Sequence, residues 1–248
     1  MEKDFNKNTI SCNLFCIQDV CNDNACLYRA VANDLYFGSP YKSINHIVSM
    51  KKWGLHKKIE DVCNDYGNYS KKQDKLSRII QSKILTFVKK NMTKLVPVLG
   101  NLTLKECIEM IHDISVEDYI EFYQTFAGDI LTNESNNTCN EFYIDRWGSV
   151  LEQWIISEML NIPIIIFNSQ KWDFKLNKIV NGKIINNKPN KDVRLRIIGI
   201  LGKKYLNDKL PIFLIWRNHN KNGHYLSLYP KNITNIKNMM IEFFQNTN

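Results

Sequence analysis

A cysteine stands where the start of a helix is expected near the N-terminus. Cys26 lies within residues 23–30, which read DNACLYRA. The first backbone N–H groups of a helix have no acceptor within the helix and carry a partial positive charge, so they stabilise an anion such as a thiolate. A thiol with an ordinary pKa of about 8.5 is only about 3% ionised at pH 7, whereas one with a pKa of about 6 is mostly ionised. This position predicts a nucleophile at Cys26.

The same backbone groups can stabilise the oxyanion of a tetrahedral intermediate, as acyl transfer requires. We expect the donors to be the backbone N–H groups of Asn24, Ala25 and Cys26. A cysteine at a helix start can also be a small apolar core residue, so the prediction requires a base near the thiol.

The chain has five histidines from which that base could come. We interpret three of them, which lie on or beside predicted helices in polar surroundings, as surface or packing residues: His46, His56 and His112. His219 falls within a predicted turn. His224 opens a predicted strand, and a rigid sheet can aim its ring at a neighbouring helix terminus. His224 is therefore the candidate base.

Apolar periodicity predicts the helices that would hold these residues. The first covers residues 25–36 and ends at Gly38 and Pro40, which places Cys26 in its first turn. The same periodicity predicts further helices over residues 76–88, 104–111, 115–128, 150–160 and 236–244. Helices therefore dominate the middle third of the chain.

Strands are expected in the last third of the chain. The segments rich in Ile, Leu and aromatic residues are 162–167, 194–201, 212–216 and 224–229. Residues 218–223 are dense in turn formers, so a hairpin should bring Trp216 close to His224. The polar, Asn-rich residues 131–139 are the best candidate for a mobile loop.

Length and composition favour one globular unit over residues 1–248. The chain has 44% hydrophobic residues, enough for a core of its own. Seven cysteines, an odd number, without a secretory leader indicate free thiols in a reducing compartment. The longest apolar run, residues 162–167, is far shorter than the roughly 20 residues of a membrane span, so no membrane partner is expected.

The formal net charge of +8 raises the question of a nucleic-acid partner. The basic residues occur as scattered pairs, such as Lys71-Lys72 and Lys203-Lys204, and no RNP-type or Gly-rich phosphate motif accompanies them. A solvated basic surface explains this pattern, so no nucleic acid is expected.

Four cysteines in a short stretch raise the alternative of a zinc site: Cys12, Cys16, Cys21 and Cys26. Structural zinc sites favour two pairs of ligands that are two to four residues apart, and only Cys12 with Cys16 has that spacing. The spacing therefore disfavours metal binding.

Three markers in this order resemble the ovarian tumour (OTU) class of deubiquitinating cysteine proteases. Its nucleophile motif is matched by Asp23, Cys26, Leu27, Tyr28 and Arg29. Its base in a late strand is matched by His224-Tyr225. Its Trp-Gly pair before a helix and an Ile-rich strand is matched by Trp147-Gly148 and residues 162–166. We interpret Trp147 and Glu152 as residues that serve the fold, the latter as a surface charge.

This resemblance implies an α+β, papain-like OTU fold with helices packed around a small, mostly antiparallel sheet. Residues 41–139 have no counterpart and are expected to be a helical insert. The implied activity is thiol-dependent hydrolysis of isopeptide bonds after the last glycine of ubiquitin, through a thioester on Cys26. The implied partners are ubiquitin, polyubiquitin or ubiquitin-like modifiers, and no cofactor is needed.

Two departures from the family pattern affect the expected site. Asn24 replaces a glycine, and asparagine tolerates the positive φ of a tight turn. Leu226 stands where many members carry Asn or Asp to orient the histidine, so we expect Leu226→Asn to keep or raise activity. Asp23 is the candidate third catalytic residue, and its alternative role is a helix N-cap.

Two other functions stay open at this point. The domain could bind ubiquitin without cleaving it, or it could be a thiol hydrolase or transferase that acts on small acyl groups. Enrichment in Lys, Asn and Ile suggests an AT-rich genome, such as that of a virus or an intracellular bacterium. The expected location is the cytoplasm, including that of a host cell.

Overall fold

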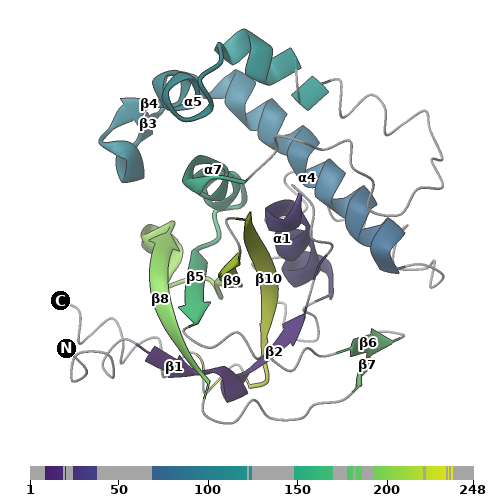
Figure 1. Ribbon diagram of the computed structural model, residues 1–248. Coiled ribbons are helices and arrows are strands. Elements are labelled where there is room, and N and C mark those ends of the chain that lie inside the picture. The colour runs from purple at the N-terminus through teal and green to yellow at the C-terminus, as the bar shows by residue number, and fades with distance from the viewer. Residues whose placement is uncertain are drawn as a thin grey trace.

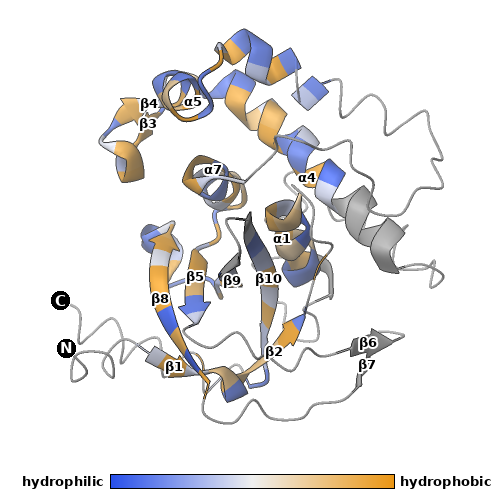
Figure 2. Ribbon diagram, viewed as in Figure 1, coloured by the Kyte–Doolittle hydropathy of each residue, from blue (hydrophilic) through white to orange (hydrophobic). Residues whose placement is uncertain are grey.

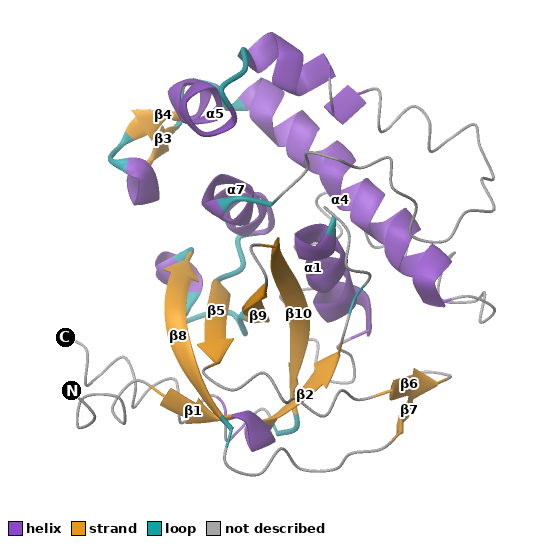
Figure 3. Ribbon diagram, in the orientation of Figure 1, coloured by secondary structure: helices purple, strands orange, loops and turns teal. Residues whose placement is uncertain are grey.

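A mostly antiparallel sheet of six strands organises the structure (Figure 3). The computed structural model describes residues 9–18, 20, 25–37, 69–121, 123–124, 148–169, 178–180, 183–185, 193–219, 222–232, 234 and 236. Across the sheet the strands are β1 (Thr9–Ser11), β8 (Arg194–Leu201), β5 (Ile164–Ser169), β9 (Ile212–His219), β10 (Asn222–Pro230) and β2 (Phe15–Gln18). Of the pairs between these strands, only β5 with β9 is parallel. The expected mostly antiparallel sheet is confirmed.

Helices cover one face of this sheet (Figure 1). They are α1 (Cys26–Phe37), α4 (Tyr69–Lys90), α5 (Leu104–His112) and α7 (Val150–Leu160), with residues 116–121 and 123–124 also helical. Helix α1 packs against β10 and β9, α4 packs against α1 and α7, and α5 packs against α7. The molecule is thus mixed α and β, as expected from the sequence.

The structure also contains smaller elements. They are η2 (Cys12–Leu14), β3 (Leu95–Val96), η3 (Pro97–Leu99), β4 (Leu102–Thr103), β6 (Lys178–Val180), β7 (Lys183–Ile185) and η4 (Lys203–Tyr205). The pairs β3–β4 and β6–β7 are short antiparallel hairpins. No described helix is both long and apolar enough to cross a bilayer.

The central strands are apolar because both faces of the sheet are buried. In β9, Ile212 and Leu214 belong to the core cluster under the helices, whereas Phe213 and Ile215 belong to a second cluster on the opposite face. Side chains of a strand alternate between the two faces, so burial on both produces a continuous apolar run. Figure 2 shows the same character in β5, which is hydrophobic until its polar last residues.

Local capping sets the bounds of α7. Ser149 is the N-cap, its hydroxyl accepts from the backbone N–H of Leu151, and its backbone N–H donates to Glu152. At the other end Asn161 adopts a left-handed conformation that ends the helix. These two signals explain why the predicted range of residues 150–160 is confirmed.

Most other predicted elements are also confirmed, including α1, α5 and β8. The predicted turn over residues 218–223 is too wide, because β9 continues to His219 and β10 begins at Asn222. Strands β1 and β2 were not expected within the N-terminal stretch. The predicted loop 131–139 and the end of the last helix lie outside the described residues, and the insert boundaries stay a prediction.

Candidate active site

Cys26 is the first residue of α1 and is 3% exposed. The helix starts here because the carbonyl of Ala25 accepts the backbone N–H of Arg29 at 3.0 Å. No acidic residue occupies the first turn, so no carboxylate of that turn opposes an anion at the positive end of the helix. Asp23 and Asn24 lie outside the described residues, so their catalytic and oxyanion roles stay predictions.

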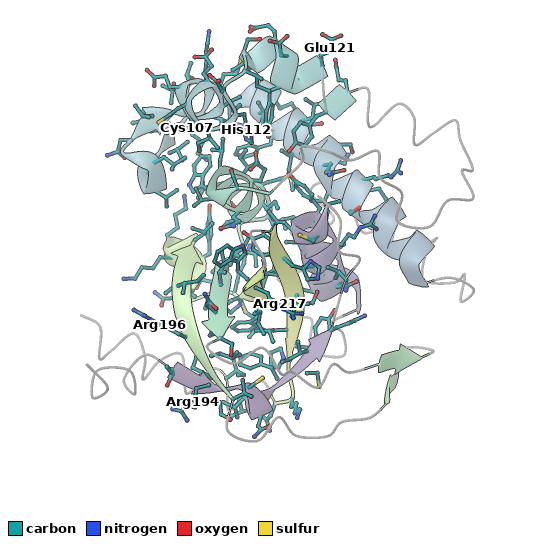
Figure 4. The ribbon with its side chains drawn as sticks, in the orientation of Figure 1. Cys107, His112, Glu121, Arg194, Arg196 and Arg217 are labelled. Atoms are coloured by element: carbon teal, nitrogen blue, oxygen red, sulfur yellow. The ribbon has the colours of Figure 1, made fainter. Side chains whose placement is uncertain are left out.

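His224 is a buried residue near the start of β10. It stands opposite Arg217 of β9, which Figure 4 labels over the sheet. Strand β2 pairs with β10 only from Ser227 onward, so His224 lies beyond the part of β10 that β2 covers. The candidate base therefore sits at the end of the sheet where β10 begins.

Two contacts fix how α1 lies along β10. The hydroxyl of Ser227 donates to the carbonyl of Ala30 at 2.9 Å. Nearer the strand start, Tyr225 belongs to the same buried cluster as Cys26. Burial is the main cause that raises the pKa of its phenol, and the nearby Cys26 raises that pKa further when it carries negative charge. From Cys26 to Ala30 the helix rises about 6 Å, and from Tyr225 to Ser227 the strand rises about 6.6 Å. The two spacings match when both elements run in the same direction.

This register puts the start of α1 level with the start of β10, where His224 lies. The two candidate residues therefore come from neighbouring ends of two packed elements, although they are 198 positions apart in the sequence. Strand alternation directs Tyr225 toward the cluster of Cys26, whereas His224 shares the opposite face of β10 with Leu226. A catalytic pair therefore requires the His224 ring to reach past the start of β10, which β2 does not cover. Direct contact between the His224 ring and the Cys26 thiol stays a prediction.

The start of α7 forms a third side of the site. The side-chain amide of Gln153 donates to the hydroxyl of Tyr225 at 2.5 Å, and that hydroxyl lies 3.5 Å from the carbonyl of Gly148. A Cβ on Gly148 would overlap the side chain of Leu27, coming within 2.6 Å of its Cβ. Only glycine allows this close approach beside the nucleophile, which explains the glycine of the Trp-Gly marker. Trp147 lies outside the described residues.

A second close approach shapes the strand start before His224. A Cβ on Gly223 would lie 2.6 Å from Nε1 of Trp216. The indole therefore rests on the backbone of Gly223, so the expected proximity of Trp216 to the start of β10 is confirmed.

The structure changes what we expect of Leu226. This side chain is 1% exposed and belongs to the apolar cluster with Phe213 and Ile215. Burying an unpaired amide there costs free energy beyond the lost apolar contacts. The expectation that Leu226→Asn keeps or raises activity neglected this cost.

We now expect Leu226→Asn to lower the free energy of unfolding by about 2–5 kcal/mol, as for large losses in a packed core. Leu226→Met, which conserves volume, should cost less than about 1.5 kcal/mol. Urea unfolding monitored by circular dichroism measures both values. An Asn variant as stable as the original protein, with equal or higher activity, would restore the first expectation.

Glu152 is not the surface charge that the sequence suggested, because its side chain is completely buried. It accepts hydrogen bonds from the backbone and hydroxyl of Ser149, from the hydroxyl of Tyr119 at 3.0 Å and from His112 at 2.9 Å. A buried carboxylate needs such partners to offset its desolvation. The carboxylate thus ties α5 and the helical residues after it to the start of α7.

His112, at the end of α5, is one of the three histidines first interpreted as surface or packing residues (Figure 4). Burial lowers its pKa, but the hydrogen bond and negative charge of Glu152 outweigh burial and raise it above the ordinary 6.5. For Glu152, burial raises the pKa, but bonds to His112 and Ser149 bring it below the ordinary 4.5. Both shifts indicate a charged pair.

This pair should make stability depend on pH with a definite sign. The contribution of His112 is present below its unfolded pKa and disappears as pH rises through its raised folded pKa. The contribution of Glu152 disappears as pH falls through its lowered pKa. We therefore expect His112→Gln to lower the melting temperature more at pH 6 than at pH 8, as measured by scanning calorimetry. If the melting temperatures of the variant and the original protein differed by the same amount at both pH values, a charged pair of His112 and Glu152 would be contradicted.

The other described cysteines do not share the position of Cys26. Burial raises the pKa of Cys12 to about 12, partly offset by Lys231, and also raises the pKa of Cys16 and of Cys107. Cys12 and Cys26 belong to clusters on opposite faces of the sheet. This separation weakens the zinc alternative further, and Cys21 lies outside the described residues.

Sequence reasoning missed Tyr225, Gln153 and Gly148 as parts of the site. Tyr225 and Gly148 stood in the quoted markers, but only as neighbours of His224 and Trp147. Gln153 carries no local signal, since its partner Tyr225 is 72 residues away.

Comparison with protein-family models gives no matching family, and no curated protein sequence matches the chain. The resemblance to the OTU class therefore depends on the residues quoted above.

Proposed function

We propose that this protein is a cysteine-type deubiquitinase of the OTU class with a papain-like fold. The observation that carries the proposal is the register of α1 along β10, in which Cys26 shares a buried cluster with Tyr225, the residue after His224. A nucleophile at a helix start beside a strand that carries a histidine suits acyl transfer. The order of the three sequence markers favours ubiquitin as the acyl donor.

In the proposed reaction His224 accepts the thiol proton of Cys26, and the thiolate attacks the carbonyl carbon of the last ubiquitin glycine. Backbone N–H groups at the start of α1 stabilise the resulting oxyanion. The lysine amine leaves with a proton from His224, and a thioester with Cys26 remains. Water, deprotonated by His224, then attacks the thioester, so ubiquitin leaves as a carboxylate and the thiol is restored.

Hydrolysis of ubiquitin that carries a fluorogenic amine at its C-terminus tests this proposal. We expect release of the fluorophore, and cleavage of at least one diubiquitin linkage at comparable enzyme concentrations. A small acyl thioester serves as the comparison substrate. Turnover of the thioester without turnover of either ubiquitin substrate would instead support a hydrolase or transferase for small acyl groups.

A further inference from the structure

Two side-chain hydrogen bonds tie the middle of β10 to helices on the same side of the sheet. Ser227 bonds to the backbone of Ala30 in α1, and the hydroxyl of Tyr225 accepts from Gln153 in α7. Ser227 stands where β2 begins to pair with β10, whereas Tyr225 stands nearer the strand start. The bond from Gln153 is therefore the tie that lies next to His224.

Gln153 is well placed to fix this tie. It is 5% exposed, and it follows Glu152, whose carboxylate anchors the start of α7. The same helix start presents Gly148, which lies against Leu27 next to the nucleophile. One rigid helix end thus contacts the strand of the candidate base and the helix of the candidate nucleophile.

We propose that Gln153, through the hydroxyl of Tyr225, is a positioning residue that holds the His224 end of β10 in register with Cys26. This inference rests on the catalytic pair of the proposed function. A thiolate beside an imidazolium is stabilised by the opposite charge, and that stabilisation falls when the distance grows. Loss of the tie lets the start of β10 move and weakens the pair without removing either member.

The pH dependence of Cys26 alkylation by iodoacetamide tests this role without any ubiquitin. Site-resolved mass spectrometry separates Cys26 from the other thiols. We expect Gln153→Met and Tyr225→Phe each to raise the alkylation midpoint by about one pH unit, so that alkylation at pH 7 slows up to about tenfold. Because both changes break one bond, the double variant should shift the midpoint no further than either single variant.

The matched controls are the same substitutions at other buried tyrosine and glutamine residues. Tyr229→Phe changes a buried tyrosine on the same face of β10, and Gln81→Met changes a buried glutamine in α4. Both should leave the midpoint unchanged. His224→Ala gives the full shift that loss of the pair produces.

Three results would overturn the positioning role. The first is an unchanged midpoint in Gln153→Met and Tyr225→Phe, even with a lower melting temperature, since that describes packing alone. The second is additive shifts in the double variant. The third is a midpoint that His224→Ala does not move, because there would then be no pair to position. If the shifts occur and no ubiquitin substrate is cleaved, the positioning role stands and only the proposed substrate fails.

Discussion

Replacement of Cys26 or His224 by alanine should reduce hydrolysis of the fluorogenic ubiquitin substrate by about 10⁴-fold or more, as for other catalytic pairs. Cys26→Ala removes the atom that forms the thioester, and His224→Ala removes the group that accepts and returns the proton. Because the two residues act as one unit, the double variant should hydrolyse the substrate no more slowly than the slower of the two single variants.

The remaining described cysteines provide the controls for this prediction. Cys12→Ser, Cys16→Ser and Cys107→Ser should keep activity within a few fold of the original protein, after correction for the folded fraction. Each has a thiol whose pKa is raised by burial, so it is a poor nucleophile. Substantial turnover by Cys26→Ala, or a comparable loss of activity in one of the control variants, would show that another residue is the nucleophile.

The second large effect concerns stability. Glu152→Ala should lower the free energy of unfolding by about 3–5 kcal/mol, because it removes the acceptor of the buried Tyr119 hydroxyl and of the partly buried Ser149 and His112. The melting temperature should fall by about 10 °C. Catalysis by the folded fraction should change much less, since Glu152 serves the fold.

Glu158 is the matched control on the same helix. Its carboxylate pairs with Lys94 and Lys204, whose side chains are 39% and 60% exposed. Water can solvate these lysines when the carboxylate is removed, so Glu158→Ala should cost only about 1 kcal/mol. Equal losses in the two variants, measured by thermal unfolding, would contradict the buried network around Glu152.

The helices could be predicted because their signals are local. The capping residues Ser149 and Asn161 lie at the ends of α7, and the apolar periodicity of α1 and α5 lies within each segment. Strands β1 and β2 could not be predicted in this way. They have three and four residues, and the partner residues of Thr9 and Cys16, Arg196 and Tyr229, are 187 and 213 positions away along the chain.

In the candidate site too, residues with local sequence signals could be predicted and residues with distant partners could not. Cys26 and His224 were predicted from a helix start, a strand start and a resemblance, all of which are visible in short segments. Glu152 was misjudged because a charged residue on a helix suggests a surface, and its partners His112 and Tyr119 are 40 and 33 positions away. Tertiary packing alone places these groups together.

The central claim is that Cys26 is the nucleophile of a ubiquitin-directed reaction. Ubiquitin with an electrophile in place of its C-terminal carboxylate tests it most directly, because such a probe forms a covalent bond only with an activated thiol at the bound tail. We predict one adduct per chain, located on Cys26 by mass spectrometry, absent in Cys26→Ala and strongly slowed in His224→Ala. Tight binding of ubiquitin without an adduct, or an adduct on another cysteine, would contradict the account.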